Sequence, residues 1–150
     1  MNQPVDEKTY RKCFTIAARA HKGQMRRGGG SYFAGHVLKV AKPFRVNKEW
    51  LCACAAILHD AVEDTDLTFD RLAANGVPDE VRKAVRAITK EPGEQYTDYL
   101  ERVMSNPTAW RVKIRDILHN LSDQPSRRQI IKYAKALPIL LTEAPESIYP

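Results

Sequence analysis

Apolar residues recur along this chain with the period of an α-helix, and no stretch of convincing length alternates as a half-buried strand does. In the segment 6–22 they stand at i, i+4, i+7 and i+8 from Tyr10, on one stripe of an amphipathic helix. The segment 108–122 repeats this spacing from Trp110. We therefore expect an all-α fold, a bundle of about seven to nine helices.

Signals that begin and end helices divide the remaining sequence. They predict further helices, in chain order, over 33–44, about 47–66, 68–76, from Pro78 onward, 97–105 and 126–142. Pro43 is expected to close the first of these, Asn47 to cap the second, and Pro138 to kink or interrupt the last. The polar tail 143–150 is expected to fray.

Composition bounds the class of protein. The chain has 150 residues, of which 43% are hydrophobic, so we expect one domain over residues 1–150. The N-terminal segment is too polar for a signal peptide, and no run of about 18 apolar residues would cross a membrane. The three cysteines are an odd number, and Cys52 and Cys54 lie in an apolar helix, as buried thiols do in a reducing compartment. We therefore expect a cytoplasmic protein.

The net charge of +6 is compatible with nucleic acid or with a small anionic substrate. The basic residues are spread along the chain, with short pairs only at Arg26-Arg27 and Arg127-Arg128. Aromatic residues are not interleaved with them, as a platform for stacked bases requires. This pattern argues against nucleic acid and favours an anionic small molecule, and it leaves a homo-oligomer open.

An apolar helix over 50–58 runs directly into a cluster of ionisable residues, namely His59, Asp60, Glu63, Asp64 and Asp66. Burying an unpaired carboxylate costs several kcal/mol, so buried carboxylates are paired or bind a metal. Residues four apart on a helix share a face, which pairs His59 with Glu63 and Asp60 with Asp64. The cluster indicates a metal or catalytic site; the alternative is a polar helix end turned toward solvent.

The segment 108–122 carries a second set of polar residues. Lys113, Asp116 and Asn120 are three and four residues apart along the border of its apolar stripe. They place a carboxylate and an amide beside a buried face, one turn apart. An ordinary ion pair on the helix surface would give the same spacing.

Four residues on separate segments have the chemistry of metal ligands, namely His36, His59, Asp60 and Asp116. Two imidazoles and two carboxylates suit a borderline divalent ion such as Mn²⁺, Fe²⁺ or Zn²⁺. Such an ion lowers the pKa of water bound to it and generates a nucleophile at neutral pH.

A basic, glycine-rich loop occupies residues 22–31, with Arg26 and Arg27 directly before three glycines. Guanidinium groups bind phosphate in a bidentate manner, so the loop is a candidate anion-binding element. The alternative is a flexible connector. It is not a P-loop, because the Gly-Lys-Ser/Thr ending is absent.

His36, then His59-Asp60, then Asp116 resembles the H…HD…D pattern of the HD-domain phosphohydrolases. The segment 59–65, His-Asp-Ala-Val-Glu-Asp-Thr, is similar to the His-Asp-x-x-Glu-Asp-Thr signature of the RelA/SpoT hydrolase domains and the small alarmone hydrolases. The segment 113–120 resembles the Lys-Leu-Ala-Asp-x-x-x-Asn motif of the same family. The similarity covers roughly residues 5–140.

The resemblance implies a role for each matching residue. His36, His59, Asp60 and Asp116 would bind Mn²⁺, and Glu63 with Asp64 would position or deprotonate the attacking water. The residues expected to hold an anionic nucleotide substrate are Arg26 and Asn120, together with Lys113 or Arg27.

The activity implied is that of a guanosine-3′,5′-bis(diphosphate) 3′-pyrophosphohydrolase. The chain departs from the family at Val37, where proline usually follows the histidine, and in the glycine-rich loop. These departures bear on substrate identity more than on reaction type. Two alternatives remain: an HD phosphohydrolase acting on another nucleotide, such as a 5′-nucleotidase or NADPH phosphatase, and an inactive nucleotide- or nucleic-acid-binding protein of this fold.

Overall fold

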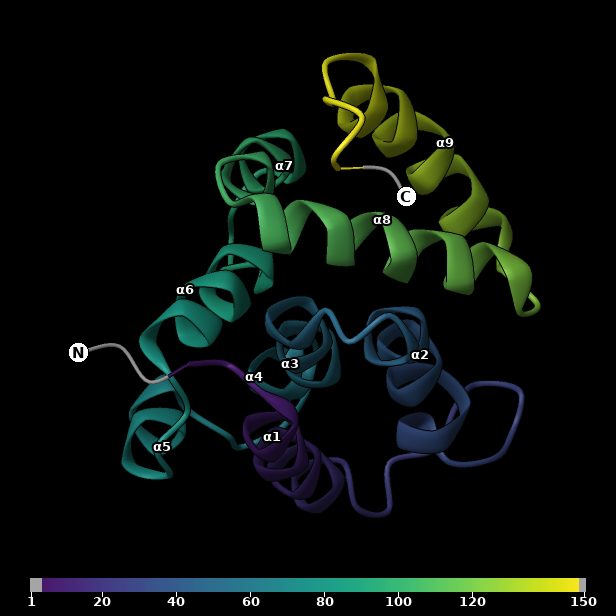
Figure 1. Ribbon diagram of the computed structural model, residues 1–150. Coiled ribbons are helices and arrows are strands. Elements are labelled where there is room, and N and C mark those ends of the chain that lie inside the picture. Colours follow the sequence, from purple (N-terminus) through teal and green to yellow (C-terminus); the bar gives the residue numbers. More distant parts are fainter. Residues whose placement is uncertain (1–3, 149–150) are drawn as a thin grey trace.

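A computed structural model describes residues 4–148 and builds them from nine α-helices and one π-helical turn (Figure 1). In chain order they are α1 Glu7–Ala20, η1 Phe33–Val37, α2 Leu38–Val46, α3 Trp50–Leu58, α4 Ala61–Asp64, α5 Phe69–Ala74, α6 Asp79–Ile88, α7 Tyr96–Met104, α8 Pro107–Ser122 and α9 Arg127–Thr142. No strand occurs within 4–148, where the β-type pairing is one isolated bridge between Met25 and Ser31. The predicted all-α fold is confirmed.

Helices α3 and α8 form the centre of the structure. Every residue of α3 from Cys52 to Leu58 is buried, and the helix packs against α1, α2, α6 and α8. Its alanines allow these neighbours to approach closely. Helix α8 runs across the middle of the molecule, with α7 and α9 on one side and α2 and α3 on the other (Figure 1). Asp116 lies on α8 and His59 directly follows α3, so these two candidate ligands belong to the centre of the structure.

Helix caps agree with the sequence in one case and differ in another. Thr68 accepts a hydrogen bond from the amide of Arg71 and begins α5, as expected. Asn47 does not cap α3; it ends α2, and Glu49 precedes α3 instead. The turn between α2 and α3 consists of residues 47–49, in which Lys48 adopts a positive φ of 57°.

Both prolines expected to break helices lie inside continuous ones. Helix α2 runs through Pro43 to Val46, and α9 runs through Pro138 to Thr142. Buried apolar side chains lie on both sides of each proline, such as Val40 and Phe44 in α2. Their burial stabilises the helix by more than the missing amide hydrogen bond destabilises it.

Two further expectations concern the ends of elements. The central helix does not continue to residues 64–66; it ends at Leu58, and α4 starts after a break at His59 and Asp60. The tail expected to fray folds back, since Ile148 is only 3% exposed; residues 149–150 lie outside the described part.

All three cysteines are buried and free, as expected. Within residues 4–148, no helix combines the length and apolarity needed to span a membrane.

Replacing Ile57 tests the central position of α3. Its side chain is fully buried, so Ile57→Ala should lower the free energy of unfolding by about 2–5 kcal/mol, from lost burial and the cavity left behind. Ile130 on α9 is 48% exposed and provides a matched control, with an expected change of about 0.5 kcal/mol. Urea denaturation of both variants measures the difference, and equal losses would contradict this packing.

Candidate metal centre

Four ligand-type side chains from three segments meet at one point inside the bundle. His36 comes from η1, His59 and Asp60 from the break between α3 and α4, and Asp116 from α8. One ligand atom from each lies within 4.8 Å of the others, so the group could hold a metal ion. The structure thus brings together all four residues that the sequence singled out as ligands.

A π-helical turn positions His36. Such turns are rare, and they often occur at functional sites because they re-aim a side chain. Gly35, directly before His36, lies against the side chain of Arg26: a Cβ atom there would be 2.9 Å from Arg26 Cδ. Glycine therefore lets the basic loop pass closely beside the turn that carries the histidine.

The helix break after Leu58 positions the adjacent pair His59 and Asp60. Neighbouring residues on a regular helix point about 100° apart, so they do not converge on one point. Here Asp60 has φ −103° and ψ −4°, at the edge of the helical region. The distortion brings His59 Nε2 and Asp60 Oδ2 to 3.0 Å from each other.

The two imidazoles present nitrogen atoms that have no hydrogen-bond partner. His36 Nε2 lies 3.0 Å from Asp116 Oδ1, and His59 Nε2 lies 3.4 Å from the same oxygen. Both Nε2 atoms are buried and form no hydrogen bond within the described residues. An unsatisfied buried polar atom is costly, and a divalent ion between these nitrogens and the carboxylates would satisfy both. The residues therefore fit a metal ion.

The other nitrogen of each ring is hydrogen-bonded. His59 Nδ1 is 2.6 Å from the carbonyl oxygen of Ala56, which can only accept, so Nδ1 carries the proton. His36 Nδ1 is 2.8 Å from Nδ1 of His119, which in its neutral form can accept a hydrogen bond from His36 in the same way. In neutral imidazoles this leaves the lone pair on Nε2, the form that ligates a metal. The sequence reasoning missed His119, which lies three residues after Asp116 on α8.

Each carboxylate is also held from outside the cluster. Asp60 Oδ2 accepts a hydrogen bond of 2.5 Å from the hydroxyl of Tyr32. Asp116 accepts a hydrogen bond of 2.8 Å from Nζ of Lys113 and another of 2.9 Å from Nδ2 of Asn120. Lys113 and Asn120, expected to hold substrate, thus orient Asp116 in this structure.

Charge keeps Asp116 ionised despite its burial. Burial alone raises the pKa of its carboxyl group, but the positive charge of Lys113 opposes this effect and is the largest influence that lowers the pKa. The resulting pKa lies well below the ordinary value. Asp116 is therefore an anion at neutral pH, as metal ligation requires.

The ligand group opens onto a cavity of about 350 Å³ between α8, α9 and the basic loop. Its lining includes the predicted Arg26, Arg27, Glu63, Asp64, Lys113 and Asn120. Arg26 forms an ion pair of 3.1 Å with Asp123. Oε1 of Glu63 accepts a hydrogen bond of 2.8 Å from the backbone amide of Lys90. All the residues predicted for substrate and water therefore border one cavity.

Helix α9 completes the cavity with residues that no motif or spacing in the sequence singles out. Gln129, Lys132 and Tyr133 line it together with the ligands Asp60 and Asp116. Tyr133 belongs to the apolar stripe of its helix, and Lys132 stands beside it as any surface lysine would. Their position depends on how α9 packs against α8, which local sequence does not reveal.

We expect His119 to control metal affinity through His36. His119→Ala removes the acceptor for His36 Nδ1 and should weaken metal binding by roughly 10–100-fold, as other changes to ligand-orienting partners do. His119→Asn retains an acceptor and should restore most of the affinity, whereas Asp116→Ala should abolish binding. Metal titration of the apo protein measures all three, and wild-type affinity in His119→Ala would contradict this role.

Comparison with known proteins gives bacterial relatives that are named for two activities, a pyrophosphokinase and a pyrophosphohydrolase. No family model matches the chain. The probable GTP pyrophosphokinase of Mycobacterium leprae is 29% identical over 142 residues, 86% of this chain and 18% of that protein. Guanosine-3′,5′-bis(diphosphate) 3′-pyrophosphohydrolase of Aquifex aeolicus is 28% identical over 127 residues, 79% of this chain and 18% of that protein. The chain thus spans about a fifth of the length of these two bacterial relatives.

A shorter relative and a solved structure agree with them. The human guanosine-3′,5′-bis(diphosphate) 3′-pyrophosphohydrolase MESH1 is 33% identical over 117 residues, 72% of this chain and 65% of that protein. The structure of a metazoan orthologue of SpoT that hydrolyses ppGpp superposes with a TM-score of 0.73 over 99% of this chain and 92% of that chain, at 23% identity. By sequence and by its HD-domain helical fold, this chain is therefore a relative of the RelA/SpoT-type hydrolases, as its motifs indicate.

Proposed function

We propose that this chain is a metal-dependent hydrolase that releases pyrophosphate from the 3′ position of guanosine 3′,5′-bis(diphosphate) and related alarmones. One observation carries the proposal: the unpartnered Nε2 atoms of His36 and His59 face two carboxylates beside a cavity lined by cations. The names of the Aquifex aeolicus and human relatives support this substrate class.

The proposed metal is Mn²⁺, held by His36, His59, Asp60 and Asp116. When bound, it supplies a nucleophile near neutral pH by lowering the pKa of water. The mixed imidazole and carboxylate donor set suits this ion, and also Fe²⁺ and Zn²⁺.

The chain's own carboxylates and cations would carry out the remaining steps. Glu63 and Asp64 follow the ligand Asp60 by three and four residues and border the cavity, where they would orient the water and accept its proton. The water oxygen bonds to the phosphorus on the 3′ oxygen, the P–O3′ bond breaks, and the 3′ oxygen takes up a proton. Arg26, Arg27 and Lys132 would neutralise the departing pyrophosphate.

Two wider statements belong to the same proposal. We assign residues 1–150 to one hydrolase domain, since a single cluster of buried residues includes members from α1 to α9. We place the protein in the cytoplasm, which the free, buried cysteines support.

The experiment that tests the function is a product assay with purified protein and added Mn²⁺. Guanosine 3′,5′-bis(diphosphate) should yield pyrophosphate and guanosine 5′-diphosphate, and chelation of the metal should stop the reaction. NADPH and 5′-mononucleotides, tested in parallel, should release little phosphate. Phosphate release from those compounds without pyrophosphate release from the alarmone would assign the protein to a different substrate class.

Removing Glu63 and Asp64 together separates chemistry from metal binding. The Glu63→Ala, Asp64→Ala double variant should keep its metal and fold but lose about 10²–10⁴-fold in turnover, the usual contribution of a general base. The matched control is Asp98→Ala, Glu101→Ala, which removes two exposed carboxylates three residues apart on α7. Metal content and rate are measured on the same preparations, and loss of the metal in the first variant would make these residues ligands instead.

A further inference from the structure

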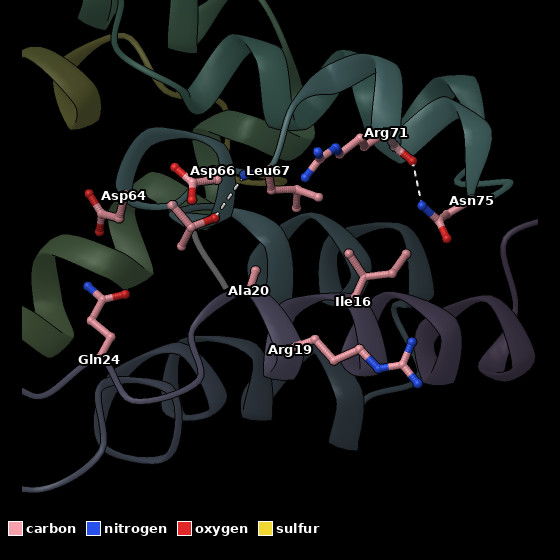
Figure 2. A pocket seen from close by; sticks show the side chains of 10 residues that line it. Ile16, Arg19, Ala20, Gln24, Asp64, Asp66, Leu67, Arg71 and Asn75 are labelled. Carbon is pink, nitrogen blue, oxygen red and sulfur yellow. Dashed lines mark hydrogen bonds between the residues drawn. The ribbon is translucent and has the colours of Figure 1, made fainter.

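A second hollow of about 690 Å³ adjoins the metal cavity, between the end of α1 and the segment that joins α4 to α5 (Figure 2). Gln24 and Asp64 line both hollows. Figure 2 shows these two residues at one end and the side chains of Arg19 and Arg71 further along, on opposite sides. The proposed water-activating carboxylate Asp64 therefore stands on the wall between the two hollows.

The lining of this hollow combines an apolar floor with two cations. Ile16, Ala20 and Leu67 provide the apolar surface between α1 and the opposite segment. No ion pair within residues 4–148 involves the guanidinium of Arg19 or of Arg71. Two guanidinium groups without ion-pair partners across an apolar surface suit a ligand with a phosphate group on a flat apolar body.

The opposite end of the hollow has the reverse charge. Asp64 and Asp66 lie there, and Asp66 likewise takes part in no ion pair among the described residues. A carboxylate is an acceptor only, so it selects a group that presents N–H donors. Guanine presents a ring N–H and an amino group side by side, whereas adenine presents an acceptor beside its amino group.

We propose that this hollow binds a second guanine nucleotide, with its 5′-phosphates at Arg19 and Arg71 and the amino edge of its base at Asp66. Guanosine 5′-diphosphate is the occupant we name, since it has both ends of the required chemistry. The site is separate from the metal cavity, and its occupation does not depend on hydrolysis.

The walls of the hollow are held in place by hydrogen bonds of the protein. Nζ of Lys12 on α1 donates to the carbonyl of Gly76 at 3.3 Å and ties the end of α5 to α1. Asn75 Nδ2 donates to the carbonyl of Arg71 at 2.7 Å (Figure 2). A ligand would therefore enter a hollow whose two sides are already joined.

A nucleotide bound in this hollow should affect the position of Asp64. The hydroxyl of Thr65 donates to the carbonyl of Ala61 at 2.5 Å and accepts from the amide of Leu67 at 3.2 Å, which makes residues 64–67 one stiff turn. A nucleotide that contacts Asp66 and Leu67 therefore contacts the same turn that positions Asp64. Binding at the hollow and hydrolysis at the metal are then coupled, with a reciprocal effect on ligand affinities.

Calorimetric titration of the protein with guanosine 5′-diphosphate in the presence of a chelator tests the site. The Arg19→Ala, Arg71→Ala double variant should bind at least about tenfold more weakly, from the loss of charge-assisted hydrogen bonds. Arg45→Ala removes an exposed arginine on α2 and is the matched control, with unchanged affinity expected. Arg26→Ala, Lys132→Ala changes the metal cavity and should retain binding at the hollow.

Three results would overturn the proposal. Binding that survives in the Arg19→Ala, Arg71→Ala variant but is lost in Arg26→Ala, Lys132→Ala would place the nucleotide in the metal cavity alone. Equal affinity for adenosine 5′-diphosphate, or an unchanged preference in Asp66→Asn, would exclude guanine recognition. Absence of measurable binding to the wild-type protein would exclude the site.

A separate measurement tests the coupling between nucleotide binding in the hollow and hydrolysis at the metal. Added guanosine 5′-diphosphate should change the rate of alarmone hydrolysis by wild type and Arg45→Ala, beyond simple competition, and this response should vanish in Arg19→Ala, Arg71→Ala. A response that persists in that variant would refute the coupling. Since binding is measured without metal or turnover, a protein that binds the nucleotide but hydrolyses nothing would refute the proposed function and leave this site standing.

Discussion

The placement of two carboxylates, the buried Asp116 and the partly buried Asp60, beside two buried imidazoles is the constraint on which the rest of this structure depends. Such charges are stable in an apolar interior only when several groups offset them. Lys113 neutralises Asp116, and the hydroxyl of Tyr32 donates to Asp60. Even so, the Nε2 atoms of both imidazoles form no hydrogen bond within the described residues. The outer atoms of the cluster are hydrogen-bonded, whereas the two Nε2 atoms at its centre are not. This is the arrangement expected of a metal centre.

Local distortions of the helices follow from that constraint. The π-helical turn at His36 and the break at His59 and Asp60 both sacrifice regular hydrogen bonding to aim side chains inward. The π-helical turn continues directly into α2, whereas the break ends α3 where a uniform helical pattern would have continued. Helix α4 and the turn at 64–67 follow this break directly, so Asp60 of the metal centre and Asp64 on the wall of the neighbouring hollow lie four residues apart.

Much of the fold was predictable, because helical periodicity reports which face of a segment is buried. The helices at 7–20, 107–122 and 127–142 agree closely with the patterns read from the sequence. The wrong predictions arise where the local helix propensity of a residue opposes the burial of its neighbours in the folded protein. Pro43 was expected to end its helix on propensity, yet burial of Val40 and Phe44 carries the helix past it.

The sequence by itself determined the helical class and the chemical identity of the four candidate ligands, since residue type and spacing within one helix are local properties. Only the tertiary structure decided that these ligands meet, that His119 orients His36, and that Lys132 from α9 borders the cavity. The physical reason is that distances between helices depend on how their buried faces pack, and no periodicity along one helix encodes that packing.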